Sequence, residues 1–277
     1  MMARAAKVPP AGIVDEVADR IVGYLKRYDA AHDSRAVFAY VYLKLTRNLA
    51  DALRRGDPKF DDPSWVAELS RSLAAEYFAA ADRMDTWLTA SGTRADQVVT
   101  ADDLPDTIPE PWRDVYAAIS GGRSYVLEDA LFSMMAHISY DLPTALRRMS
   151  EVVDIAGHVA DYHRMNDVLG SAVDGVQDDL ANRYSRWLAD LDRLFARDDE
   201  LFSNYGIRLS RGMAWYNFTR LCDAHASAEA ERSIRTSTLA FIREVREPDD
   251  PVLRLAVRVG RLVIPERRQW PSPDANP

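Results

Sequence analysis

The stretch GIVDEVADRIVGYLKRYDAA, residues 12–31, places an apolar side chain at every fourth position, at Ile13, Val17, Ile21 and Leu25. An α-helix has 3.6 residues per turn, so side chains at this spacing form one stripe along it. We therefore expect an amphipathic helix over residues 12–31 that buries this stripe in a core.

Helical periodicity continues along most of the chain. Residues 35–55 are expected to form the next helix, capped by Asp33 or Ser34. A third helix is expected to begin at Asp62, because the following Pro63 fits the first helical turn. We find no internal repeat and no run of residues typical of a strand. The sequence therefore predicts an all-α fold, packed as an antiparallel helical bundle.

Two segments interrupt this pattern. Residues 91–111 are polar and contain prolines, which is typical of a linker, a lid or the rim of a pocket. Residues 266–277 are rich in proline, and we expect them to be a loosely held tail. The sequence thus predicts a single helical domain over residues 1–265, followed by this tail.

Composition limits the classes of function. Hydrophobic residues make up 47% of the 277 residues and charged residues 28%, as is usual for globular proteins. The formal net charge of −8 argues against a general nucleic-acid binder, which needs a basic face. No stretch reaches about 18 uninterrupted apolar residues, and the N-terminus lacks an apolar core of the signal-peptide type. We therefore expect a soluble cytoplasmic protein that binds neither nucleic acid nor membrane.

The segment MMAHISYDLPTALRRM, residues 134–149, resembles an apolar helix but carries His137 and Asp141 on one side and Pro143 within it. Pro143 lacks an N–H and clashes with the carbonyl four residues back, so the helix could restart there with Asp141 as its cap. Alternatively, Asp141 is a half-buried acid that orients His137 as an acid–base pair inside the bundle. Both interpretations remain open at this point.

The long helix expected around DYHRMNDVL places Asn166 at the centre of its apolar seam. A buried amide must be hydrogen-bonded, or it costs about 1–3 kcal/mol. His158 and His163 lie on opposite edges of the seam. Asp161 and Asp167 lie about 120° from its centre, and we expect both in solvent.

These directions argue against a metal cluster within the sequence HVADYH, because its polar side chains point different ways. A site built from two helices, with His137, Asp141, His163 and Asn166, remains geometrically possible. Such a site could hold a metal, or it could be a hydrogen-bonded structural network. We predict no metal ligand.

A third polar residue on an apolar face is Arg211, which shares a stripe with Ile207, Ala214 and Phe218 and has Trp215 four positions further on. A buried guanidinium needs an acid, an aromatic ring or a ligand anion. We expect it to reach a carboxylate, with Asp141 the first candidate, or to open into a cavity. The alternative is that its charged end extends to solvent at the end of the bundle.

One motif favours a different class. The sequence NDVLGSAVD (Asn166, Asp167, Gly170, Asp174) looks like the second magnesium motif of class I terpene cyclases. That resemblance implies a second, aspartate-rich motif on an earlier helix. The only candidates are FDDPSW and ADDLPD, which are expected in loops or at helix starts.

Four blocks of sequence, AHISYDLPTAL, DYHRMNDVL, VDGVQDDL and RGMAW, occur in this order. They resemble an uncharacterised bacterial family that is known only as a domain of unknown function. The resemblance covers most of the chain. It implies an all-helical fold and no established activity.

The leading hypothesis is an enzyme that acts on a small organic substrate by acid–base chemistry, as a cyclase, lyase or hydrolase of secondary metabolism. The alternative is a non-catalytic small-molecule binder or helical interaction module, and the third is a metal-dependent enzyme like the terpene cyclases. No cofactor is indicated. The expected site consists of three catalytic residues and three residues that bind substrate: His137, Asp141 and His163, and Asn166, Arg211 and Trp215.

Overall fold

The computed structural model describes residues 8–122, 124–173, 175–185, 204–252, 254–255, 258–259 and 268–272. Within them the only bridge between extended segments joins Ser185 and Arg268. The all-α fold predicted from the sequence is confirmed, whereas the antiparallel order of the helices stays a prediction. The main helices are α1 (Pro10–Ala30), α2 (Arg35–Arg55), α3 (Pro63–Ser91), α4 (Glu110–Ile119), α5 (Val126–Ala136), α6 (Leu142–Ser150), α7 (Val159–Val173), α8 (Val176–Tyr184), α10 (Asn204–Cys222) and α11 (Ser227–Arg246).

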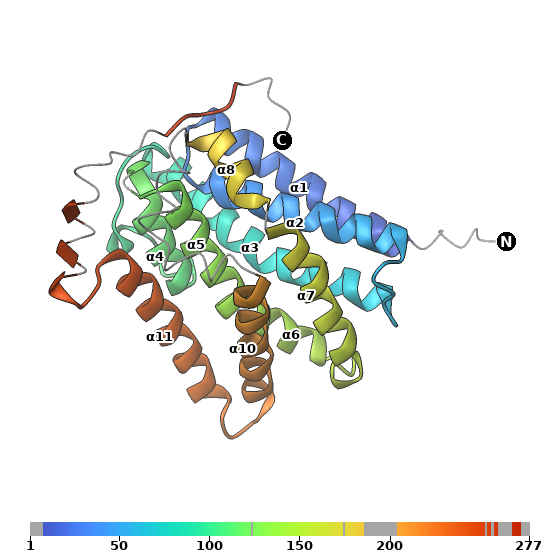
Figure 1. The fold of residues 1–277 in the computed structure, drawn as a ribbon. Helices are drawn as coiled ribbons and strands as arrows, with labels where there is room; N and C mark the ends of the chain where they lie inside the picture. The colour runs from blue at the N-terminus through green and yellow to red at the C-terminus, as the bar shows by residue number, and fades with distance from the viewer. Residues whose placement is uncertain are drawn as a thin grey trace.

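Buried apolar side chains from Ile13 in α1 to Ile242 in α11 form one main core. The predicted stripe on α1 is entirely within it. Helices α1 and α2 lie side by side, and α10 lies between α11 and α7 on another side of the bundle (Figure 1). The two ends of the described chain therefore contribute to a common core.

The predicted helix starts are confirmed where caps were expected. The side chain of Asp62 accepts the N–H of Trp65 at 3.0 Å, and α3 begins at Pro63. Asp33 accepts the N–H of Arg35 at 2.9 Å at the start of α2. Both bonds satisfy amide groups that the first turn of a helix leaves without a partner.

The segment of residues 92–109 packs against the bundle. Val99, Leu104 and Ile108 are buried, and a short 3-10 turn covers Ala101–Asp103. The segment lies against Gly121, which has a φ of 66° and where an added Cβ would lie 2.4 Å from the side chain of Val98. Glycine is needed there both for the left-handed backbone and for the close approach.

Arg268 and Trp270 contact the bundle, while the loosely held tail over residues 266–277 stays a prediction. The guanidinium of Arg268 lies 2.7 Å from the carboxylate of Asp129, which is buried. Trp270 stacks on His32 with 5.2 Å between ring centroids. The proline-rich composition gave no sign that a buried acid more than a hundred residues away would bind this segment.

We expect Arg268→Leu to lower the free energy of unfolding by about 3 kcal/mol, because it removes a cation that pairs with the buried carboxylate of Asp129. Urea unfolding measures the change. The matched control is Arg94→Leu, which breaks an exposed pair with Asp96 and should cost at most about 1 kcal/mol. Equal losses in the two variants would show that the tail does not stabilise the fold.

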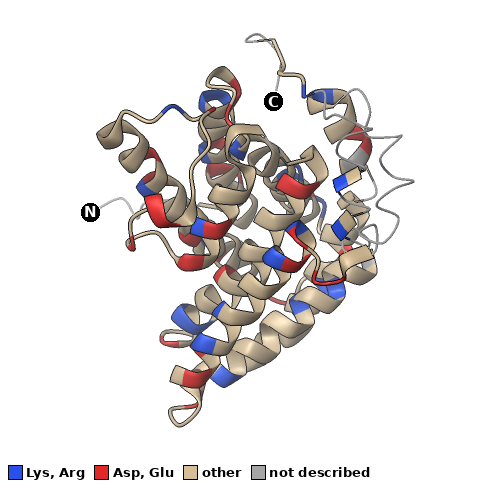
Figure 2. Ribbon diagram, turned by 90° about the vertical axis from the view of Figure 1, so that its left-hand side faces the viewer, with Lys and Arg blue, Asp and Glu red and all other residues tan. Residues whose placement is uncertain are grey.

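Figure 2 shows Lys and Arg interspersed with Asp and Glu over the helices. Among the residues described, no helix is both long enough and apolar enough to cross a membrane.

Candidate functional site

The helix does not break at Pro143, because it forms a wider turn between α5 and α6. His137–Asp141 form one turn of π-helix, and the N–H of Leu142 donates to the carbonyl of His137, five residues back. The wider turn accommodates a proline ring that would clash with a carbonyl of an ordinary α-helix. The chain therefore continues directly into α6, and the turn brings His137 and Asp141 to the interior.

The helix-cap interpretation of Asp141 is wrong, because its side chain makes no cap hydrogen bond. The indole Nε1–H of Trp112 donates to both carboxylate oxygens of Asp141, at 3.0 and 3.2 Å. Its Oδ2 lies 3.1 Å from Nδ1 of His137. Asp141 is 2% exposed and His137 is 3% exposed, so the predicted pairing of these two residues inside the bundle is confirmed.

Burial raises the pKa of Asp141, whereas the hydrogen bonds from His137 and Trp112 oppose this shift. An ionised carboxylate can only accept hydrogen bonds, so it selects the tautomer of His137 with the proton on Nδ1. Nε2 then carries a lone pair. Two aromatic rings also hold the imidazole of His137 in place. Their centroids lie 4.5 Å (Tyr42) and 5.4 Å (Phe38) from the centroid of the imidazole.

His137 lines a cavity of about 60 Å³ between α2, α3, the π-turn, α7 and α10. Its Nε2 is buried and has no hydrogen-bond partner among the described residues. Tyr42 lines the same cavity, and its buried hydroxyl also has no hydrogen-bond partner in that part of the chain. Polar groups without partners are costly when buried, so these two are available to a ligand.

Arg211 of α10 lines the cavity too, and it is 2% exposed. Its Nε–H donates to Oδ1 of Asn166 at 2.5 Å, and the guanidinium lies 4.4 Å from the ring centroid of Tyr162. Burial lowers the pKa of Arg211. The expectation that Arg211 faces a cavity is confirmed. The expectations that it contacts Asp141 or that it extends to solvent are wrong. Trp112 and His137 occupy the oxygens of Asp141 instead.

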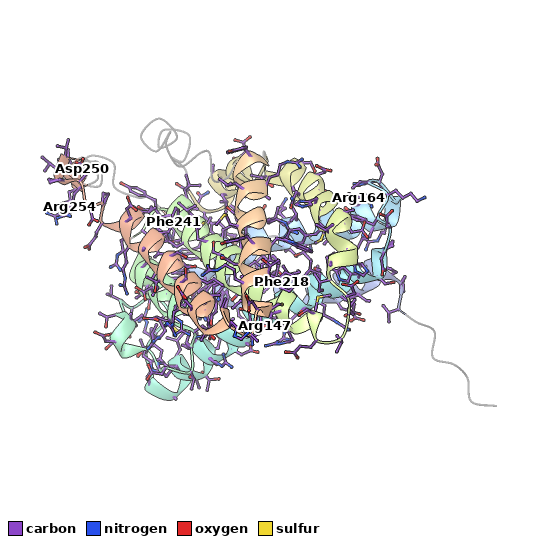
Figure 3. All side chains as sticks on the ribbon, turned by 90° about the horizontal axis from the view of Figure 1, so that it is seen from below. Arg147, Arg164, Phe218, Phe241, Asp250 and Arg254 are labelled. Carbon is purple, nitrogen blue, oxygen red and sulfur yellow. The ribbon has the colours of Figure 1, made fainter. Side chains whose placement is uncertain are left out.

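The structure brings together only part of the expected site. Asn166 is buried and bonded to Arg211, as its place in the seam required. His163 is exposed, and Trp215 is half-buried against Tyr162, with 4.7 Å between ring centroids. Neither lines the cavity. Figure 3 shows α10, which carries Phe218, between α11 and α7, with Arg164 of α7 at the edge of the bundle.

Asp161 is buried, so the expectation that it lies in solvent is wrong. It accepts the backbone N–H groups of Asp61 and Asp62 at 2.8 and 2.7 Å, which fixes the chain at the start of α3. Asp167 is exposed as expected and pairs with Arg208.

The structure gives the terpene-cyclase interpretation no support. Asn166 points to Arg211 and Asp167 to solvent, while Asp174 lies outside the described residues. Asp62, from the candidate motif FDDPSW, caps α3. Within the described parts of the chain, no group of three or more His, Cys, Asp and Glu residues could hold a metal ion.

Sequence reasoning missed Tyr42 and Trp112. Both lie on helices with many apolar residues, where an aromatic side chain is usually part of the core. Their roles depend on contacts with His137 and Asp141, which are distant in sequence, and no local pattern indicates such contacts.

These features define an all-helical protein with a buried His–Asp pair beside a cavity that a buried arginine also lines. A family of unknown function (DUF5995) matches residues 14–248, and the chain belongs to that family. The resemblance stated from the four sequence blocks is thereby confirmed. Comparisons with curated proteins and with solved structures found no match.

Proposed function

We propose that this protein is a soluble cytoplasmic enzyme that moves a proton to or from a small organic substrate in the cavity. One observation carries the proposal: His137 lines the cavity and has Nδ1 paired with Asp141, while its Nε2 has no hydrogen-bond partner among the described residues. A histidine oriented in this way by a carboxylate acts as a general base and returns the proton as a general acid.

The side chains have distinct roles in this proposal. Nε2 of His137 takes the proton, and Asp141 stabilises the imidazolium that forms. Trp112 holds Asp141 in place through its indole N–H. Arg211 pairs with a negatively charged oxygen of the substrate, in the ground state and in the transition state. Asn166 positions Arg211 and does not contact the substrate, and His163 and Trp215 have no role.

The expected reaction classes share this step. Hydrolases activate water with a base, and lyases and cyclases move protons at the carbon skeleton or at its oxygens. A place in secondary metabolism remains part of the proposal.

The second candidate is a binder without catalysis, and the observation that favours it is the apolar character of most of the wall. Leu45, Leu49, Leu69 and Ile207 all line the cavity. A binder would use His137 only as a hydrogen-bonding group. The two candidates therefore differ in whether a bound compound reacts.

Proton NMR in D₂O distinguishes them, with a panel of short-chain carboxylic acids, 2-oxo acids, esters and aldehydes. We expect deuterium incorporation or product formation with at least one class of compound. His137→Gln should abolish it, while His163→Gln, which changes an exposed histidine, should leave it intact. Binding of compounds from the panel with no reaction of any of them, or a reaction that survives in His137→Gln, would contradict the proposal.

A further inference from the structure

We infer that the ligand of this cavity is a monocarboxylate with an unbranched apolar tail. Its carboxylate binds Arg211 and the hydroxyl of Tyr42, and its tail leaves between α3 and α7. The inference rests on the proposed function for the location of the site, and it adds the chemical class of the ligand.

The positive charge of Arg211 has no opposite charge beside it in the described chain. Arg211 is buried, and no carboxylate pairs with it among the described residues. Its contacts are an amide oxygen, the ring face of Tyr162 and the sulfur of Met165, all of them neutral. A buried cation with only neutral neighbours is costly unless a ligand supplies the opposite charge.

The guanidinium of Arg211 also has a donor that can bind a ligand. Nε–H of Arg211 is already used by Asn166, whereas Nη2 has only the sulfur of Met165 at 3.8 Å. Sulfur is a weak acceptor, so Nη2 can donate to a better one. A carboxylate matches the planar guanidinium group and its hydrogen-bond donors.

The charged residues of the lining limit the charge of the ligand. The described lining holds no Lys, Asp or Glu, and Arg211 is its only arginine. A dicarboxylate would bury a second negative charge without a matching cation, and an amine would place a positive charge near Arg211. The lining therefore fits a ligand with a single negative group.

The cavity is small, and two of its lining residues are partly exposed. A cavity of 150 Å³ holds benzene, so about 60 Å³ holds roughly two or three non-hydrogen atoms, the size of a carboxylate group. Leu73 of α3 and Leu169 of α7 are half-buried, while the other lining residues are buried. The rest of the ligand must pass between these two leucines, which favours an apolar tail.

Tyr42 provides the second contact. Burial raises the pKa of its hydroxyl, so it stays protonated and can donate a hydrogen bond. It has no acceptor among the described residues. A carboxylate oxygen beside Arg211 would supply one.

Isothermal titration calorimetry with butyrate, hexanoate, octanoate and hexanamide tests the inference. We expect the carboxylates to bind, with affinity rising by up to about fourfold for each methylene that enters the apolar mouth. Hexanamide has the same tail without the charge and should bind at least tenfold more weakly than hexanoate.

Arg211→Met should remove the preference for hexanoate over hexanamide, and Tyr42→Phe should weaken hexanoate binding severalfold. The matched control is Arg208→Met, an exposed arginine of the same helix, which should bind hexanoate like the wild type. If Arg211→Met does not fold, the wild-type comparison of hexanoate with hexanamide decides alone. Equal binding of these two compounds, or no binding of any carboxylate, would overturn the inference.

The outcomes also separate this inference from the proposed function. His137→Gln should still bind hexanoate and should lose deuterium exchange. Carboxylate binding without any chemistry contradicts the enzyme proposal alone. If neutral compounds react and carboxylates do not bind more tightly than neutral compounds, only the inference about the ligand is contradicted.

Discussion

Asp141→Asn is expected to lower kcat/KM by about two to four orders of magnitude. The amide keeps the shape of the side chain, and its oxygen can still accept the indole N–H of Trp112. Its NH₂ group would then face Nδ1 of His137 and donate to it, which moves the ring proton to Nε2. The nitrogen that should accept a proton becomes a donor, so the base is lost without a change in packing.

The same substitution should leave stability unchanged or raise it at neutral pH. Burial raises the pKa of Asp141 in the folded state above its unfolded value of about 3.9. At pH values between these two pKa values, the folded state binds more protons than the unfolded state. The free energy of unfolding of the wild type therefore falls as pH rises through this window. Asp141→Asn removes this contribution. Urea unfolding at a series of pH values measures it.

Asp161→Asn is the matched control, since Asp161 is an equally buried acid that holds the start of α3 and does not line the cavity. It should lose stability and keep turnover. If Asp141→Asn instead lost several kcal/mol of stability while turnover stayed intact, Asp141 would be structural.

Arg211→Lys should lower kcat/KM by about two orders of magnitude, as expected when a charged contact to the transition state is misplaced. Lysine keeps the positive charge but loses the planar group that lies over Tyr162 and donates to Asn166. The free energy of unfolding should fall by only about 1 kcal/mol, because the buried amide loses one hydrogen bond.

The partner of Arg211 can be identified by double-mutant cycles on stability. Arg211 and Asn166 are in contact, so substitutions at these positions should show a coupling of about 0.5–3 kcal/mol. The cycle between Arg211 and Asp141 should show less, because Asp141 is bonded to other residues. A large loss of stability in Arg211→Lys with full turnover would assign Arg211 to packing.

The sequence predicted the helices well because periodicity is a local property. Ile13, Val17, Ile21 and Leu25 are all buried as their spacing indicated. Asn166 and Arg211 could each be recognised as polar residues on an apolar face. The hydrogen bond between them could not be predicted. The direction of a side chain around its own helix does not indicate which residue of a neighbouring helix faces it.

The remaining differences have similar causes. Pro143 is compatible with both a broken helix and a π-turn, and only the packing of the whole segment selects the turn. His163 and Asp161 both lie off the seam of α7. Asp161 is covered because the start of α3 packs over it, whereas His163 stays exposed. The burial of residues beside a helical seam depends on tertiary neighbours.

The central claim is that His137 is held by Asp141 with Nε2 as a free base. Nitrogen-15 NMR of the histidine side chains at mildly alkaline pH tests it most directly, with His137→Gln used to assign the signal. The account predicts a neutral ring with the proton on Nδ1 in the wild type, and on Nε2 in Asp141→Asn. A wild-type ring that carries its proton on Nε2, or protons on both nitrogens, would contradict it.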